Sequence, residues 1–298
     1  MAEVAIIGGG IAGSSVALYL SQIKELNITL FEKEQSLVSG PPMCHLHAGG
    51  NLYREIDDDQ CVTLLKQSIE LVRLYPYAID FRPTVLITPL DDPQKPEDML
   101  QRLQLLRDTY AKMVAEDSAN EVLGKSKHYF TLFERKEVED LAHKEIVQNP
   151  QTPQEWMIPV AKHVDLSRVA FPIIMVQEYG LNMFRISVSV TTLLRDTPNV
   201  TLNLSTPIHA IERAKEGYNI NGKKYDYLIN AAGFRSGEID DILGYHRERL
   251  VEFKAAYVRQ CHAMRGDGRR LFFTDKGAHR VGWRSLHPIQ ADIFSFMG

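Results

Sequence analysis

The chain has 298 residues, which is enough for two domains, and apolar residues make up 44% of it, so a sizeable core is available. The net charge of −4 includes no large block of like charge, and this argues against a protein that binds nucleic acid through its phosphates. The three cysteines, Cys44, Cys61 and Cys261, are widely spaced, which suits a reducing compartment and argues against a disulfide scaffold.

The apolar residues 4–20 raise the question of a signal peptide. Glu3 is the only charged side chain before them, and three consecutive glycines interrupt the run, so a strand, a turn and a helix explain the segment better. No other stretch reaches the roughly 18 uninterrupted apolar residues of a transmembrane helix. We therefore expect no integral membrane segment and predict a cytoplasmic location.

The first elements in chain order are a strand, a glycine-rich turn, a helix and a second strand. Val4–Ile7 is a short continuous apolar run, typical of a buried parallel strand. Glycine-rich residues 8–13 follow, and Ser14–Leu20 has small and apolar residues at helical spacing. The second strand, Ile28–Phe31, ends on Glu32. This order is the context that the dinucleotide fingerprint G-x-G-x-x-G requires.

Each part of the fingerprint has a physical role. The first glycine allows the tight turn out of the strand, the second lets the backbone approach a pyrophosphate, and the third lets the helix pack closely. The helix N-terminus offers unpaired N–H groups to the phosphates. Glu32 can accept hydrogen bonds from ribose hydroxyls, and an acid at this position disfavours NADP. The predicted cofactor-binding residues of this segment are Gly8, Gly10, Ile11, Ala12, Gly13, Glu32 and Lys33. The alternative is a glycine-rich turn in an α/β protein that binds nothing.

Residues 40–52 have turn chemistry throughout and include one cysteine and two histidines. One interpretation is a loop beside a flavin, in which Gly49 and Gly50 let the backbone approach the ring and a histidine such as His47 lies near the flavin or the substrate. A second is a covalent flavin link through histidine or cysteine, and a third is simply a structured loop with hydrogen-bonded histidines. A metal site is disfavoured, because the three ligands are packed too tightly for the usual spacing and no second cluster is evident. We therefore predict no metal.

Three helices and one strand are expected in the middle of the chain. The helices are predicted at residues 59–75, 97–117 and 134–147, and the strand at residues 81–88. The pattern identifies no catalytic acid or base. The polar side chains that could contact a substrate, each more simply explained as an ordinary surface or strand residue, are Arg82, His128, Tyr129, Lys162, His163 and Arg185.

A helix at Met183–Leu194 and a group of strands follow. The strands are predicted at residues 200–204, 207–214, 218–220 and 223–230. Asn221-Gly222 is a strong hairpin signal between the last two strands. Ala231, Ala232 and Gly233 then close the final strand, and such small residues let a backbone approach a ligand.

Three segments together resemble the D-amino-acid-oxidase-like family of FAD-dependent oxidoreductases: VAIIGGGIAGSSVALYL with ITLFEK, then SGPPMCHLHAGGNLY, then TPIHAIE with YDYLINAAGF. The resemblance implies that the first segment binds ADP and the second runs beside the flavin. In the third, Ile208 would contact adenine through its backbone, and Gly233 would lie by the FAD phosphates. Ala232 beside it is also predicted to bind the cofactor.

This resemblance implies an α/β fold, with a Rossmann-like FAD-binding domain and a discontinuous α+β substrate domain that would be incomplete here. The FAD-binding domain is expected at residues 1–80 and 175–250, and a partial substrate domain with its helices at residues 81–174.

The tail, residues 258–298, differs from the rest of the chain. Basic residues outnumber acidic ones in it, whereas the reverse holds before it, and clear periodicity fades. Complete family members continue with further strands and a glycine-rich flavin segment. Reading the codons of residues 272–277 one base earlier permits Ile-Phe-His-Gly-Gln-Arg, which such a strand and turn could contain. We hypothesise a truncation or a frameshift near residues 258–270, which the coding DNA tests.

These observations favour an FAD-dependent oxidoreductase that oxidises a small amine, amino acid or hydroxy acid by hydride transfer to the flavin. The alternatives are an NAD-dependent reductase and a catalytically degenerate flavin-binding protein. Against a two-nucleotide disulfide reductase, the chain has no second G-x-G-x-x-G and no C-x-x-C pair. The expected partner is a small-molecule substrate, without nucleic acid.

Overall fold

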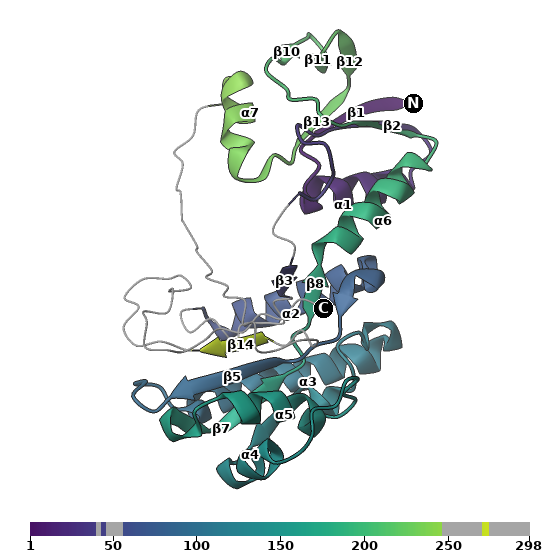
Figure 1. Ribbon diagram of the computed structural model, residues 1–298. Helices are drawn as coiled ribbons and strands as arrows, with labels where there is room; N and C mark the ends of the chain where they lie inside the picture. The colour runs from purple at the N-terminus through teal and green to yellow at the C-terminus, as the bar shows by residue number, and fades with distance from the viewer. Residues whose placement is uncertain (40–42, 46–55, 246–269, 274–298) are drawn as a thin grey trace. The chain divides into compact units, whose positions relative to one another are not determined.

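The computed structural model describes residues 1–39, 43–45, 56–245 and 270–273 (Figure 1). The chain packs into two compact units. Unit 1 comprises Met1–Cys44 and Asn182–Val251, and unit 2 comprises His45–Leu181 and Glu252–Gly298. Each unit is therefore built from two separate pieces of sequence.

A four-stranded parallel sheet forms the centre of unit 1, in the order β13-β1-β2-β9. Its strands are β1 (Ala2–Ile7), β2 (Leu26–Phe31), β9 (Val200–Asn203) and β13 (Tyr227–Asn230). β1 and β2 each end in four buried residues, because both faces of the sheet are covered. The strands predicted at residues 4–7 and 28–31 are confirmed.

Helices α1 (Ile11–Leu20) and α6 (Met183–Arg195) cover one face of this sheet (Figure 1). The other face carries α7 (Ser236–Ile242) and a small antiparallel sheet of order β10-β11-β12. Those three strands are β10 (Glu212–Arg213), β11 (Tyr218–Ile220) and β12 (Lys223–Tyr225). Ala5, Ile7 and Phe31 pack there against Ile220 and Ile239. Because side chains alternate along a strand, β1 and β2 supply apolar groups to both layers.

The predicted Asn-Gly hairpin is confirmed between β11 and β12. Asn221 has φ 48° and Gly222 has φ 80°, the pair of positive values that a tight primed hairpin turn needs. The strand predicted at residues 207–214 is wrong, since only Glu212 and Arg213 pair in a ladder. Ile208 and Ile211 instead pack against the core beside the small sheet, so the apolar residues cover the core without strand pairing.

Unit 2 contains a mixed sheet of order β14-β5-β7-β6. Its strands are β5 (Thr84–Pro89), β6 (Phe130–Phe133), β7 (Val169–Val176) and β14 (Arg270–Phe273). β7 pairs antiparallel with β5 and β6, and β14 pairs parallel with β5. The long helices are α2 (Asp58–Leu74), α3 (Leu100–Glu116), α4 (Arg135–Ala142) and α5 (Pro153–His163). Helices α4 and α5 bury apolar side chains against this sheet.

The short elements complete the described chain. They are the strands β3 (Met43–His45), β4 (Ile79–Asp80) and β8 (Gly180–Asn182), and the 3₁₀ turns η1 (Pro76–Ala78), η2 (Pro96–Met99), η3 (Ser118–Asn120), η4 (Ser126–His128), η5 (Leu166–Arg168) and η6 (Gly233–Arg235). None of the described helices is long and apolar enough to cross a membrane.

Predictions for the middle of the chain need three corrections. The strand placed at residues 81–88 begins at Thr84, because the Arg82 N–H turns back to the Asp80 carbonyl and Pro83 has no N–H to donate. The helix placed at residues 134–147 ends at Ala142, and the chain then turns so that Val147 packs against the core. Helix α5 and strand β7 were not predicted. Helix α5 starts with a Thr-Pro-x-Glu capping box that could have revealed it.

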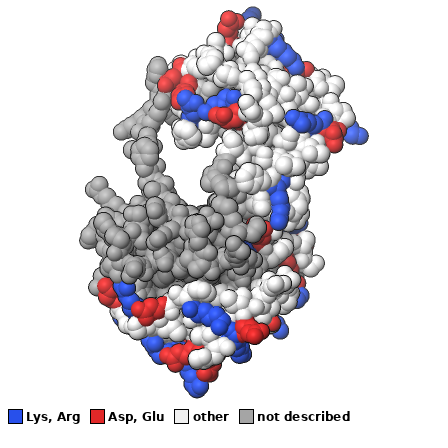
Figure 2. Space-filling model, viewed as in Figure 1, with Lys and Arg blue, Asp and Glu red and all other residues white. Residues whose placement is uncertain are grey.

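Acidic and basic side chains are interspersed over the described surface in view (Figure 2). Many are neighbours in ion pairs, such as Arg102 with Asp58 at 2.9 Å and Lys136 with Asp140 at 3.1 Å. Such exposed pairs each contribute about 0–1 kcal/mol. The charged faces of the helices are therefore solvated surface.

Candidate dinucleotide-binding site

The strand order of unit 1 creates a topological switch point between β1 and β13. From β1 the chain steps to β2 and β9 on one side, and then returns to β13 on the other. In open parallel sheets, ligands bind in the crevice outside the carboxyl ends of the strands at such a point. Two small-residue loops leave these strand ends, one beginning at Gly8 and the other at Ala231. The Ala231 N–H donates to the Ile7 carbonyl at 2.8 Å, so the two loops start side by side.

Gly8 and Gly13 are glycines because neighbouring backbone leaves no room for a side chain. Gly8 has φ 103°, and a Cβ there would overlap the Ala231 carbonyl. A Cβ on Gly13 would overlap the Gly8 carbonyl and lie 3.1 Å from the Ala231 Cβ. Helix α1 can therefore pack directly against both loops, which is the close approach that the fingerprint predicts.

Gly10 and Gly233 differ from these two, because a Cβ on either would meet no atom of the described residues within 4 Å. Gly10 lies at the start of α1, and Gly233 follows β13 with φ 59°. Open space beside two glycines on adjacent loops is what a backbone approach to a ligand requires.

The N-terminus of α1 has no N-cap side chain to bond its first N–H groups. Gly10 is the N-cap residue and makes no side-chain hydrogen bond, and the first turn contains no acidic residue. The first N–H groups of a helix have no intrahelical partner, and together with the helix dipole they attract an anion. Ile11 is half-buried and Ala12 is exposed in this turn, so the backbone there is accessible.

The Glu32 carboxylate follows β2 and is only 7% exposed. Its Oε2 accepts a hydrogen bond from the Gly9 N–H at 2.6 Å, and its Oε1 accepts one from the Glu34 N–H at 2.8 Å. A Cβ on Gly9 would lie 2.9 Å from the Glu32 Cβ, so this contact also requires glycine. Glu32 thus holds the glycine loop, and each oxygen keeps a further lone pair. The ribose contact stays a prediction. Lys33 is exposed and lies 3.2 Å from the Glu34 carboxylate.

The second loop is held by a residue that the sequence analysis missed. The Asn230 side chain accepts a hydrogen bond from the Ala232 N–H at 3.3 Å and donates to the Ser236 carbonyl and the Asp240 carboxylate. A polar residue at the end of an otherwise apolar strand, just before Ala-Ala-Gly, was the available signal. Ala232 and Ile208 are half-buried against the adjoining core, and the backbone contact predicted for Ile208 stays a prediction.

His47, Gly49 and Gly50 lie outside the described residues, so the interpretations of residues 40–52 stay open. The described part of the chain holds no group of three or more His, Cys, Asp or Glu side chains that could bind a metal.

The structure gives the local surroundings of the six possible substrate groups. Arg82 forms an ion pair with Asp80 at 3.3 Å, and Lys162 donates to the Ala142 carbonyl at 2.8 Å. Tyr129 is fully buried in unit 2, and burial raises the pKa of its phenol well above the ordinary value. The remaining three, all exposed, are His128, His163 and Arg185.

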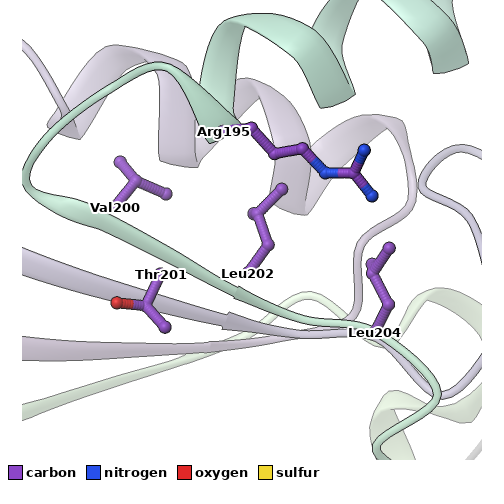
Figure 3. A pocket seen from close by; sticks show the side chains of 5 residues that line it. All are labelled: Arg195, Val200, Thr201, Leu202 and Leu204. Atoms are coloured by element: carbon purple, nitrogen blue, oxygen red, sulfur yellow. The ribbon is translucent and has the colours of Figure 1, made fainter.

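A pocket of about 460 Å³ lies beside the edge strand β9 (Figure 3). Arg195 from the end of α6 borders it, together with Val200, Thr201, Leu202 and Leu204 from β9 and the residues that follow. Strand β9 is at the opposite edge of the sheet from β13, so this pocket is separate from the switch point.

Comparison with known proteins agrees with the geometry. Residues 3–154 match the model of the family DAO, FAD dependent oxidoreductase, and the chain belongs to this family. The sequence resemblance and the α/β class with a Rossmann-like FAD-binding domain are thereby confirmed, and FAD is the cofactor of the family. No curated protein sequence matches the chain.

Similar solved structures include L-proline dehydrogenase from P. horikoshii, with a TM-score of 0.50 and 16% identity over 83% of this chain and 57% of that one. Glycine oxidase from Geobacillus kaustophilus has a TM-score of 0.45 and 12% identity over 82% of this chain and 59% of that one. The chain thus spans less than two thirds of the length of these proteins.

Proposed function

We propose that this chain binds FAD and acts as an oxidoreductase on a small amine, amino acid or hydroxy acid. The observation that carries the proposal is the meeting of two small-residue loops, at Gly8 and Ala231, at the switch point of a parallel sheet. Membership of the FAD dependent oxidoreductase family supports the choice of FAD over NAD.

The described residues fit the ADP half of the cofactor. The uncapped N-terminus of α1, with open space at Gly10, suits the pyrophosphate, and Gly233 offers a second backbone approach from the neighbouring loop. The free lone pairs of Glu32 suit the ribose hydroxyls. We also propose that cofactor contacts around the pyrophosphate and ribose come from Ile11, Ala12, Lys33 and Ala232. Ile208 would contact the adenine, and the residues beside the flavin would be His47, Gly49 and Gly50.

We also propose that the FAD-binding domain spans residues 1–80 and 175–250, and that residues 81–174 contribute to substrate binding. Unit 1 is defined by packing and leaves residues 45–80 and 175–181 in the other unit, whereas the proposed domain is defined by contact with FAD. When bound, FAD would supply a two-electron acceptor: the substrate carbon would give up a hydride, the amine or hydroxyl would lose a proton to solvent to leave an imine or a ketone, and oxygen, a quinone or another acceptor would then take the electrons. This chain's residues bind and orient the two molecules.

A visible spectrum of the purified chain tests the cofactor. Bound FAD gives absorption bands at about 370 nm and about 450 nm. A colourless protein that takes up no added FAD and binds NADH would contradict the proposal. Anaerobic addition of proline, glycine, other amino acids, amines and hydroxy acids then tests the activity, since a substrate bleaches the band near 450 nm. A coloured protein that none of these bleaches would be a flavin binder without the proposed activity.

A further inference from the structure

Asn230 is the last residue of β13, and its side chain joins three groups that are not otherwise adjacent in the chain. Its Nδ2 donates to the Ser236 carbonyl at 2.8 Å and to the Asp240 Oδ1 at 3.0 Å. Its Oδ1 accepts from the Ala232 N–H at 3.3 Å. One amide thus links the strand end, the loop after it and helix α7.

Asp240 gives this link a firm anchor. Its side chain is only 6% exposed on α7, and its carbonyl accepts a hydrogen bond from the Tyr245 N–H at 2.8 Å. A hydrogen bond from an amide to a carboxylate is stronger than one between neutral groups. The neighbouring Ile239 packs in the core under β1 and β13, which fixes the position of the helix relative to the sheet.

The loop that Asn230 holds is the one that meets Gly8. Asn230 pairs with Ile7 in the parallel ladder, and Ala231 donates to the Ile7 carbonyl. Between this ladder and η6 only Ala231 and Ala232 intervene, and the Asn230 amide bonds the N–H of the second of them. The direction of the backbone at Gly233 therefore depends on this side chain.

We propose that Asn230 is a positioning residue for the dinucleotide, which holds the loop Ala231–Gly233, through Ala232, Ser236 and Asp240, in the conformation that approaches the phosphates. The inference rests on the proposed function, because it assigns the ligand of this loop as FAD. Asn230 itself touches neighbouring protein groups, and its effect on FAD passes through the loop.

The test uses the full chain, three variants and a matched control variant. Asn230→Asp keeps the shape and the acceptor for Ala232, but it turns an oxygen toward the Asp240 carboxylate and the Ser236 carbonyl. Asp240→Asn keeps an oxygen that can accept from Asn230. The double variant places the carboxylate at position 230 and the amide at position 240, so a donor and an acceptor again face each other. Asn219→Asp is the matched control, because its amide bonds the exposed Glu212 carboxylate in the β10–β11 hairpin of the same unit.

Two quantities are measured: the FAD dissociation constant of the apoprotein by flavin titration, and hydrogen exchange at residues 231–235 without FAD. We expect Asn230→Asp to raise the dissociation constant about tenfold or more and to speed exchange in the loop, as for a lost charge-assisted hydrogen bond. The control should stay within about twofold of the parent chain. Asp240→Asn removes the charge from the bond to Asn230, so its dissociation constant should lie between those of the control and Asn230→Asp, and the double variant should recover part of the affinity lost in Asn230→Asp.

Unchanged FAD affinity and unchanged loop exchange in Asn230→Asp would overturn the inference while leaving the proposed function intact. Equal loss in Asn230→Asp and the double variant, with thermal unfolding of both apoproteins lowered alike, would also overturn it, because a general loss of packing would then explain the effect. If the parent chain binds no FAD, the proposed function fails first, and the exchange data alone report whether Asn230 holds the loop.

Discussion

At the scale of single residues, Gly10 and Gly13 stand three positions apart and are glycines for different reasons. A side chain on Gly10 would enter open space, whereas one on Gly13 would enter backbone. The same fingerprint thus contains one position reserved for a ligand and one required by packing. Substitutions at the two positions should separate FAD binding from stability.

Gly10→Ser should weaken FAD binding without destabilising the apoprotein. Gly10 has the extended conformation of an N-cap, with φ −64° and ψ −176°, so serine could cap α1 and raise the free energy of unfolding by about 0.3 kcal/mol. Its side chain would occupy the space of the pyrophosphate, and we expect the FAD dissociation constant to rise about tenfold or more. Urea unfolding and flavin titration measure both. Unchanged affinity would show that the phosphate does not approach Gly10.

Gly13→Ala should destabilise the apoprotein, although alanine favours a helix over glycine. The new Cβ would overlap the Gly8 carbonyl, so α1 must shift away from the loop. Overpacking of this kind costs about 1–3 kcal/mol, which exceeds the gain of about 1 kcal/mol in helix propensity. Urea unfolding of the apoprotein checks this, with Gly10→Ser as the comparison. An unfolding free energy equal to that of the parent chain would contradict the packing role of Gly13.

At the scale of elements, one ion pair joins the small antiparallel sheet of unit 1 to its parallel sheet. The Lys223 ammonium on β12 lies 2.8 Å from Oε2 of Glu3 on β1, and Asn27 on β2 donates to Oε1 at 2.7 Å. The hydrogen bond from Lys223 lowers the pKa of Glu3 below its ordinary value, and the same bond raises the pKa of Lys223. Both shifts stabilise the folded state when both groups are charged.

The pH dependence follows from the two directions. The Glu3 contribution is complete above the ordinary pKa of a glutamate and is lost as pH falls through its lowered folded value. The Lys223 contribution is complete below the ordinary pKa of a lysine and is lost as pH rises through its raised value. Lys223→Met should therefore lower the free energy of unfolding near neutral pH by less than about 1 kcal/mol, since the pair is partly exposed. It should also make the fall in this free energy below about pH 5 less steep. Urea unfolding from about pH 3 to pH 7 measures this, and an unchanged slope would contradict it.

At the scale of the whole molecule, the two units have separate cores. One cluster, around Ile7 and Ile239, lies in unit 1, and another, around Phe133 and Met157, lies in unit 2. Bound ligand stabilises the parts of a protein that open together with its site. The FAD contacts that we propose for described residues all lie in unit 1, so bound FAD should stabilise unit 1 against local opening.

Hydrogen exchange in the presence and absence of FAD tests this. We expect FAD to slow exchange in residues 8–12 and 231–233 and to leave α4 and α5 unchanged, since those helices pack against the sheet of unit 2. Equal protection of α4 and α5 would show instead that both units open as one. The two helices serve as the internal control within the same sample.

The local features were predictable because neighbouring residues determine them. The order strand, glycine turn, helix, strand and Glu32 lies within the first 32 residues, and the Asn221-Gly222 turn needs only two residues. The apolar residues within 207–211 led to a wrong strand prediction, because they pack against a core made by other segments. The truncation or frameshift near residues 258–270 stays a hypothesis, which the coding DNA tests. Only Arg270–Phe273 of the tail belongs to the described chain, as a strand beside β5.

The sequence by itself determined the glycines, the acid at position 32 and the small residues at 231–233, because hydrogen-bonding capacity and the lack of a Cβ belong to a residue wherever it lies. The tertiary structure alone decided which loops meet. Residues 7 and 230 become neighbours only through parallel pairing of β1 with β13. Packing also placed a Glu32 oxygen on the Gly9 amide and the Asn230 amide on Asp240. Such contacts join residues that are distant in the chain, and a local pattern contains no information about them.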